Sequence, residues 1–537
     1  MRFVRYTLVC LSALFIPAAV TAAGQQQTPP PPPATMPAPA GMQMPSLEPA
    51  GPVKPLSVDE AVTLALRNNL GLQIERLNPA IEDELIASAR SGYVPTLSTA
   101  FRTNGSITQP RSFTEGNEAF STDSISSSFT FTQQALPWTN TQLQASWSGS
   151  RTTTGGLAPS FNPNIGSSFN VQAAQPLLRN FLVKPIQNQI EQAVISRQIA
   201  DITLRQRVVG TERSVRQAYW NLVGAIERLS VARQNLDLSQ TQLKNNRVRV
   251  EVGTMAPIDI IAAEAEVAGN EEAVITAEAA IRANEDALRI LVMDPNAPDF
   301  WTSRIEPTNK PEVQAMQINL ETAIASALES RTDMVNARKQ LQVSDLSLKL
   351  SKNQTLPDLS LNASLTGTAS GGTQFSYFPG TITEDVTRRS ERGFGSTLGD
   401  VFGFAYPNWS VGVNFAYPIG KAAAEANHAR ATLQRRQFDA QMKSLELSVV
   451  QQVRGAARNV TSNFQRVQST RVARDLAEKR LAAQQKRFDV GLSTLFELTQ
   501  AQRDVVLQRN NELNAVIAYN QAIVDFQLVQ VAPLGGF

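Results

Sequence analysis

The feature that most constrains this chain is an internal duplication. Residues 215–267 match residues 453–505 at a constant shift of 238, with identical residues recurring along the overlap. A second shift, of 262, aligns Pro95 with Pro357. A repeat of 238 to 262 residues is far longer than the roughly 20 to 50 residues of a solenoid unit. The sequence therefore predicts two similar halves and an architecture built by symmetry.

The composition argues against a helical membrane protein. Hydrophobic residues make up 42% of the chain and aromatic residues 7%. No segment beyond the N-terminus reaches the roughly 18 to 20 uninterrupted apolar residues that a transmembrane helix requires. Any membrane-spanning part is therefore expected to be a β-barrel. The net charge is only +2, and no basic patch indicates nucleic-acid binding.

The first 55 residues predict two segments that precede the duplicated halves. Residues 1–23 are typical of a secretory signal peptide, with Arg2 and Arg5 before an apolar core and small residues at the expected cleavage site. The only cysteine, Cys10, lies in this segment, so the mature chain is expected to have neither a disulfide nor an acyl anchor. Residues 24–55 are rich in proline and are expected to form an extended tether.

Each half is expected to begin as helix and to continue as β-strands. The helical pattern ends at Tyr93 in the first half and at Gln354 in the second, just before Pro95 and Pro357. Beyond each proline, apolar residues alternate with uncharged polar residues. Such strands suit a sheet with lipid on one face and water on the other, although a soluble sandwich has a similar pattern. The alternating runs are residues 97–101, 129–132, 143–147, 169–173, 359–366 and 411–417.

Very long helices are predicted after the strands. The strands end near Pro176 and Pro418, and proline is then absent from residues 186–256 and from residues 419–532. A helix of some 65 residues is about 100 Å long at 1.5 Å per residue. No single globular domain accommodates such helices, so an extended coiled coil is expected.

Each long helix is predicted to fold back on itself at a glycine. Gly253 and Gly491 end the long helices, and returning helices are expected over residues 258–293 and 495–529. Each half is therefore helix, strands, long helix, tight turn and returning helix. The predicted organisation is a signal peptide (1–23), a tether (24–55), repeat 1 (56–294), a connecting segment (295–318), repeat 2 (319–532) and a C-terminal tail (533–537).

Over about residues 56–530 this arrangement resembles the TolC-like outer-membrane efflux proteins. The resemblance is carried by the two Val-Gly turns, each with an acid six residues after its glycine, and by the paired proline junctions. It implies an α+β membrane protein, a homotrimer whose strands form one outer-membrane β-barrel continued by a coiled-coil α-helical barrel. It also implies four strands per subunit, although additional alternating sequence between Ser126 and Ser150 leaves open a longer hairpin or an external excursion.

The same resemblance implies a passive exit duct of a tripartite efflux or type I secretion system. The duct would sit in the outer-membrane lipid of a Gram-negative-type cell and extend into the periplasm. Its tip would dock onto a periplasmic adaptor, a membrane fusion protein, that is coupled to an inner-membrane pump. The alternative is a periplasmic coiled-coil adaptor or scaffold, which ordinarily has one such hairpin rather than two. The candidates for docking are Val252, Gly253, Thr254, Val490, Gly491 and Leu492.

Four residues near the turns are candidates for the aperture of the duct. Asp259 and Glu497 each follow a glycine by six residues, and a threefold ring of Glu497 would favour cations. The simpler alternative is an acid stabilised by its helix dipole. Phe488 occupies a position where the family uses an aromatic residue in closure, with simple packing as the alternative. Gln500 and Ser493 stand where relatives carry a second acid and an arginine, so a double acidic ring is not expected.

The sequence predicts neither an enzyme nor a metal site. The only histidine, His428, has no cysteine or second histidine with which to form a site. The acidic residues of the helices alternate with Lys and Arg, which is typical of a solvated face. No phosphate-binding loop or nucleophile motif is present, so no catalytic residue and no cofactor are assigned.

Overall fold

The computed structural model describes residues 51–110, 118–155, 159–377, 386–419 and 422–534. The expected signal peptide, most of the expected tether and the last three residues of the expected tail lie outside these ranges. The end of the tether segment forms strand β1 (Val53–Leu56), which pairs in parallel with β6 (Arg304–Pro307) in the connecting segment. The tether segment and the connecting segment therefore form a two-stranded parallel sheet with each other.

The single helix expected up to Tyr93 is in fact several shorter ones. Asn69 interrupts it: its backbone is extended, and its side chain accepts a hydrogen bond from the Leu72 amide and so begins the next helix. Asparagine favours such caps because its side chain competes for backbone hydrogen bonds. The elements are α1 (Val58–Asn68), α2 (Leu70–Glu75), α3 (Asn78–Arg90) and the 3-10 turn η1 (Ser91–Tyr93).

The matching helix of the second half is likewise divided, here at Arg331. The segment forms α6 (Leu320–Ser330) and α7 (Thr332–Gln354). Arg331 is extended and fully buried, and its guanidinium donates to the Asp333 carboxylate at 2.9 Å and to the Gln452 side chain at 2.6 Å. A buried charge requires such partners, and long-range contacts of this kind are not visible in helical periodicity.

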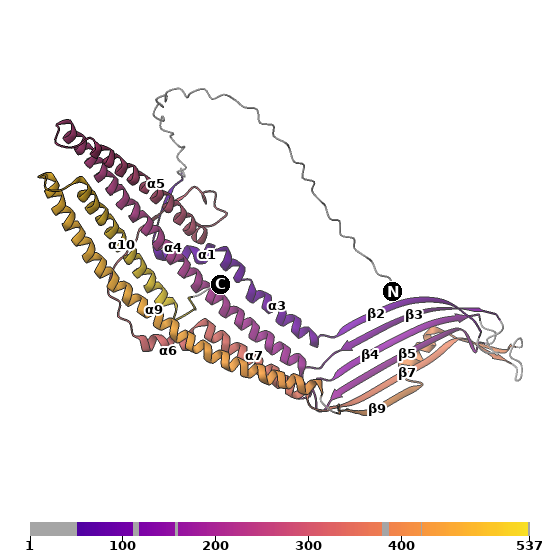
Figure 1. Cartoon of the computed structure of the whole chain (residues 1–537). Helices are drawn as coiled ribbons and strands as arrows, with labels where there is room; N and C mark the ends of the chain where they lie inside the picture. The colour runs from indigo at the N-terminus through magenta and orange to yellow at the C-terminus, as the bar shows by residue number, and fades with distance from the viewer. Residues whose placement is uncertain (1–50, 111–117, 156–158, 378–385, 420–421, 535–537) are drawn as a thin grey trace, which may run out of the picture. The chain divides into compact units, whose positions relative to one another are not determined.

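The strands of both halves form one antiparallel sheet, in which β2, β3, β4, β5, β7 and β9 follow one another (Figure 1). The short β8 also pairs with β7. β9 pairs with the first part of β7 and β8 with its last part, so the sheet is six strands wide. All six predicted strand runs are confirmed. The strands are β2 (Thr96–Thr108), β3 (Phe120–Gln133), β4 (Gln142–Thr154), β5 (Phe161–Pro176), β7 (Asp358–Tyr377), β8 (Val386–Arg392) and β9 (Pro407–Ala416).

The two halves differ in their number of strands. The first half supplies β2 to β5, whereas the second supplies β7, β9 and the short β8. The extra sequence between Ser126 and Ser150 is a hairpin within the sheet, because β3 and β4 pair with each other and with β2 and β5. The expected four strands per subunit are therefore too few for this chain.

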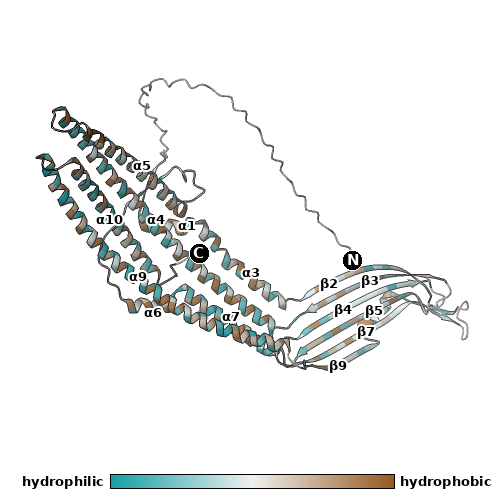
Figure 2. Ribbon diagram, viewed as in Figure 1, coloured by the Kyte–Doolittle hydropathy of each residue, from teal (hydrophilic) through white to brown (hydrophobic). Residues whose placement is uncertain are grey.

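The sheet has one apolar and one polar face. Residues that pair across strands point to the same face, and one such row runs through Leu97, Phe131, Ala145, Val171, Leu365 and Trp409. The neighbouring row runs through Ser98, Thr130, Ser146, Asn170, Thr366 and Asn408. Figure 2 shows this alternation along the strands. A short helix, α8 (Phe394–Phe402), packs on the apolar face, where Phe402 lies 5.3 Å from Phe169 between ring centroids.

Two long helical hairpins continue from the sheet (Figure 1). The first is α4 (Pro185–Glu251) with α5 (Ile258–Val292), and the second is α9 (Ala423–Asp489) with α10 (Leu495–Leu528). Both α4 and α9 have 67 residues, which confirms the predicted long helices and returning helices. None of the helices described combines the length and the apolar character needed to cross a membrane.

Each hairpin has its own apolar core with the short helices of its half. In the first half, Tyr219 and Leu222 of α4 pack with Leu288 of α5 and with α1. In the second half, Val453 of α9 packs with Tyr519 of α10 and with α6. The apolar stripe of α4 is thus used inside its own repeat, which leaves other residues to join the two hairpins.

Candidate functional site

The turns of the two hairpins have the same geometry. Gly253 and Gly491 both adopt a left-handed backbone with φ of +77°. The amides of Thr254 and Leu492 donate to the carbonyls of Arg249 and Arg487, each at 2.8 Å. Together with the bonds of the glycine amides, these form a Schellman motif at the end of both α4 and α9. Only glycine adopts this conformation without steric cost, which explains why the sequence repeats it.

The surface around these turns is apolar and exposed. Val252 and Val490 are about as exposed as Leu492, whose exposed fraction is 78%. Two residues that the sequence did not single out join them, Ile258 and Phe496, with Phe496 75% exposed. Both open a returning helix, and an apolar residue in the first helical turn after the glycine is the signal that could have identified them. We call these five exposed residues the apolar tip.

Phe488 is packed inside the second turn. Its side chain is 5% exposed and contacts Leu495 and Leu498, with Met255 of the first hairpin beside them. The guanidinium of Arg249 lies 4.7 Å from the centre of the Phe488 ring and forms an ion pair with Asp489 at 3.1 Å. Arg249 thus joins the end of α4 to the end of α9, a contact that helical periodicity does not reveal.

Glu497 forms a capping box at the start of α10. Its carboxylate accepts hydrogen bonds from the Ser493 hydroxyl at 2.7 Å, the Thr494 amide at 3.2 Å and the Gln484 side chain at 3.1 Å. The Thr494 hydroxyl in turn accepts from the Glu497 amide at 3.3 Å. The Ser493 hydrogen bond, followed by that of Thr494, holds the pKa of Glu497 below its ordinary value. Ser493, which stands at the position where the family resemblance implies an arginine, therefore donates a hydrogen bond to the Glu497 carboxylate.

The other two aperture candidates lie on separate helices. Asp259 is in the first turn of α5, where its amide donates to the Ala256 carbonyl at 3.0 Å. Gln500 lies on α10, one turn beyond Glu497, and donates to Asp504 at 3.0 Å. Asp504 is also paired with Arg480 of α9, at 3.0 Å. The structure thus gathers Phe488, Glu497 and Gln500 in the second hairpin, whereas Asp259 belongs to the first.

The contacts between the two hairpins are mainly polar. Near the tip, Arg503 of α10 forms an ion pair with Glu266 of α5 at 2.5 Å, and this hydrogen bond raises the pKa of Arg503. Farther from the tip, α10 packs along α4 through polar pairs and through Ile517, which lies against Gly224. We call the polar pairs that join the two hairpins, including Arg503–Glu266 and Arg249–Asp489, the polar seam. Its other pairs are Arg228–Asn514 at 2.6 Å, Asn221–Gln521 at 2.8 Å and Arg213–Asp525 at 2.7 Å.

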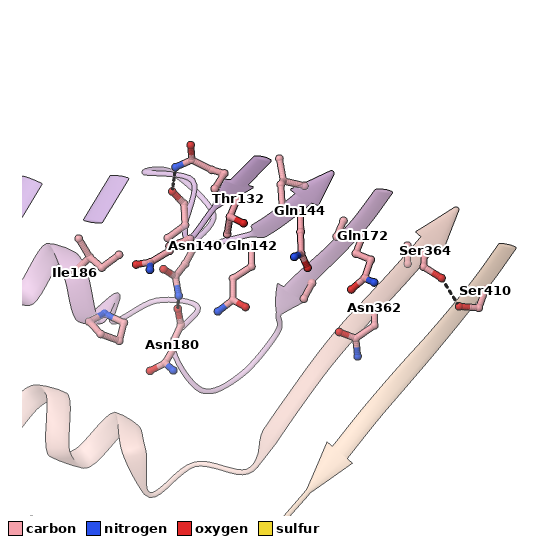
Figure 3. A pocket seen from close by; sticks show the side chains of 18 residues that line it. Thr132, Asn140, Gln142, Gln144, Gln172, Asn180, Ile186, Asn362, Ser364 and Ser410 are labelled. Atoms are coloured by element: carbon pink, nitrogen blue, oxygen red, sulfur yellow. Dashed lines mark hydrogen bonds between the residues drawn. The ribbon is translucent and has the colours of Figure 1, made fainter. Parts of the chain in front are cut away.

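At the opposite end of the long helices, the polar face of the sheet lines a cavity of about 730 Å³ (Figure 3). The side chains of Gln142, Gln144, Gln172 and Asn362 line it, and Ser364 and Ser410 lie hydrogen-bonded at 2.8 Å on its rim. The junction prolines border this region: Pro95 and Pro357 precede β2 and β7, Pro176 ends β5, and Pro418 follows β9. The residues that line this cavity are uncharged and offer hydrogen-bonding groups.

No metal site is evident in the described ranges, where no group of three or more His, Cys, Asp or Glu could hold an ion. His428 lies on α9, with its Nδ1 3.4 Å from the Ser351 hydroxyl.

The profile of the outer membrane efflux protein family matches residues 132–292 and 323–529, which is more than half of the chain. This chain belongs to the outer membrane efflux protein family. The two matched ranges cover both long hairpins and the strands that lead into them. As a member of this channel family, the protein lies in the outer membrane, extends into the periplasm and forms the exit duct of an efflux system.

Solved channels of similar fold agree with this assignment. CusC shares 13% identity with this efflux protein, with a TM-score of 0.64 over 91% of this chain and 96% of that chain. The Campylobacter jejuni CmeC outer membrane channel shares 14%, with a TM-score of 0.62 over 88% and 85%. The open state of the Neisseria gonorrhoeae MtrE outer membrane channel shares 16%, with a TM-score of 0.58 over 88% of both. A sequence comparison with curated proteins finds no match.

Proposed function

We propose that three copies of this chain form one passive duct, whose tip docks onto a periplasmic adaptor coupled to an inner-membrane pump. The observation that carries the proposal is the sheet with one mainly apolar and one mainly polar face. Such a sheet is stable with lipid on one side and water on the other. Its continuation into the two hairpins supports a conduit that leads from the membrane to the apolar tip.

Trimer formation is tested by fractionating membranes and comparing heated with unheated samples on a denaturing gel. The expected result is an outer-membrane species with three times the mass of the mature chain that falls to the mass of one chain on heating. Recovery of the mature chain as a soluble monomer would contradict the proposed duct.

The apolar tip is the proposed docking surface for the adaptor. Exposed apolar side chains at the end of a soluble helical structure are a feature of protein interaction sites, and Val490 and Leu492 are among the most exposed. Val490→Asp and Leu492→Asp are expected to abolish efflux in cells while leaving the amount of trimer unchanged. Val490→Ile keeps the apolar surface and is expected to retain efflux. Full efflux by both aspartate variants would exclude these residues from docking.

Glu497 is the proposed acidic ring at the aperture, in addition to its capping role. Glu497→Gln is expected to weaken cation preference in planar bilayers. Thr494→Ala serves as the control because it removes the cap from α10 but keeps the charge. If both variants change ion selectivity equally, or if neither changes it, Glu497 acts only as a cap.

A further inference from the structure

The sheet of one chain is open at both edges. β2 lies at one edge and β9 at the other, beside the helical end of β7. Every residue of β9 and nearly every residue of β2 is exposed. The unpaired amides and carbonyls of such edges must find partners, above all in lipid.

The two edges are suited to each other. β2 leads away from the helical junction at Pro95, whereas β9 leads back toward the junction at Pro418. A sheet six strands wide begins and ends with strands of opposite direction, so β9 of one copy and β2 of the next would be antiparallel like all other pairs in the sheet. An even strand number per chain is what ring closure by identical copies requires.

We infer that three copies close a ring of eighteen strands, six from each chain, by pairing β9 of one copy with β2 of the next. This inference rests on the proposed trimer and adds its strand number, its joining strands and their register. The hairpin of β3 and β4 is what raises the number, because without it each chain would supply four strands and the ring twelve.

The duplication predicts the register of the joint. Within one chain, Pro176 of β5 lies opposite Ser360 of β7. Pro418 corresponds to Pro176, because each lies at the end of the last strand of its half. The shift of 262 makes Ser98 the equivalent of Ser360. Pro418 should therefore lie opposite Ser98 of the next copy.

Following the antiparallel strands from that point gives testable pairs. Ala416 should lie opposite Ala100 of the next copy, and Val413 opposite its Thr103. The faces of the sheet agree with this register. Ala100 of β2 and Ala416 of β9 both lie on the polar face, whereas Thr103 and Val413 both lie on the apolar face. The apolar face would thus continue across the joint, as a surface in lipid must.

The consequence is a wide opening to the outside. Barrel diameter grows roughly linearly with strand number, so eighteen strands give a diameter about 1.5 times that of twelve. A ring of that size leaves an aqueous channel. Near the helical end, its lumen would be lined by Gln, Asn, Ser and Thr, as around Gln144 and Gln172. Arg102 of β2 lies on the same polar face and would add a charge farther along the strands. The strand section would then admit bulky solutes, and any narrowing would lie at the helical tip.

The test uses cysteine cross-linking in the full-length protein in membranes, where the predicted mature chain has no other cysteine. The two matched double variants are Ala100→Cys with Ala416→Cys and Thr103→Cys with Val413→Cys. Within one chain these positions lie at opposite edges, about 24 Å apart at five strand spacings, far beyond the roughly 7 Å limit for a disulfide. A cross-link can therefore form only between copies, and oxidation should yield covalent dimers and trimers.

The mismatched combinations, Ala100→Cys with Val413→Cys and Thr103→Cys with Ala416→Cys, use the same four substitutions on opposite faces and should remain monomers on a denaturing gel. A strand count from electron cryomicroscopy of the unmodified trimer is the second measurement. Cross-linked matched pairs and eighteen strands support the inference. A trimer with twelve strands or without matched cross-links overturns it, whereas the absence of any trimer overturns the proposed function as well.

Discussion

Two single residues, Gly253 and Gly491, determine where the two hairpins turn. The Schellman hydrogen bonds require the left-handed backbone that both glycines adopt. No side chain packs against either glycine, since a Cβ there would meet nothing within 4 Å. The constraint is therefore conformational and does not arise from crowding.

Gly253→Ala and Gly491→Ala are each expected to destabilise their turn by about 1–2 kcal/mol, the cost of a left-handed residue with a side chain. Hydrogen exchange of the tip peptides should become roughly 5- to 30-fold faster. Gly269→Ala is the matched control, because Gly269 lies within helix α5 in open space, where alanine stabilises by about 0.5–1 kcal/mol. Unchanged exchange in the turn variants would contradict the conformational role.

The Glu497 cap predicts a pH dependence at the tip. Hydrogen bonds from Ser493 and Thr494 lower the pKa of Glu497 below 4.5 in the folded state. A group with a lowered pKa stabilises the fold above its unfolded pKa, and this contribution is lost as the pH falls through the folded value. The first turn of α10 should therefore stay protected at neutral and mildly acidic pH and lose protection below pH 4.5. After correction for intrinsic rates, Glu497→Gln should show no such step, and a step that persists in this variant would assign it to another group.

At the scale of secondary-structure elements, the strands determine which residues lie on each face of the sheet. Alternation along each strand decides which residues share a face, and pairing aligns those faces across β2 to β9. Neighbouring residues of one strand therefore face different environments. On β9, Val413 belongs to the apolar face and Asn414 to the polar face.

Arginine substitutions at these two adjacent positions should differ sharply. Val413→Arg places a charge on the apolar face and is expected to destabilise the assembled protein by about 2–4 kcal/mol if the position lies near the bilayer midplane. Asn414→Arg places the same charge on the polar face and should be tolerated. The amount of heat-modifiable trimer in outer-membrane fractions measures both. Equal loss in the two variants would contradict the assignment of the faces.

At the scale of the whole molecule, the two helical hairpins are joined largely by the polar seam. The main apolar core of each hairpin lies within its own repeat. The hairpins are joined by Arg503–Glu266 and the other seam pairs, and also by the packing of Met255 against the Phe488 cluster and of Ile517 against Gly224. Separating polar pairs costs less than opening an apolar core, because water replaces the lost hydrogen bonds. The seam is therefore the place where the hairpins can move relative to each other without unfolding.

Breaking the seam near the tip is expected to favour an open duct. Glu266→Gln removes the ion pair with Arg503, and a pair of this kind contributes up to about 1 kcal/mol, so the open fraction in planar bilayers should rise up to about fivefold. Exchanging the charges, Glu266→Arg with Arg503→Glu, should restore closure. Arg480→Gln is the control, because its Asp504 partner lies in the same hairpin. An equal rise in this control would argue against a gate at the seam.

Local pattern in the sequence was sufficient for the elements of this protein. The glycine turns, the 67-residue helices and the alternating strands follow from backbone conformation and periodicity, which depend on neighbours in the chain. Only the tertiary structure decided the rest. Periodicity does not show which residues contact each other. It therefore could not predict the breaks at Asn69 and Arg331, the hairpin of β3 and β4 within the sheet, the hydrogen bond from Ser493 to Glu497, or the polar seam. The Asn69 cap and the Ser493 contact are local side-chain hydrogen bonds that periodicity does not describe. The Arg331 contact, the place of the β3–β4 hairpin in the sheet and the seam depend on residues far apart in sequence, which only tertiary packing brings together.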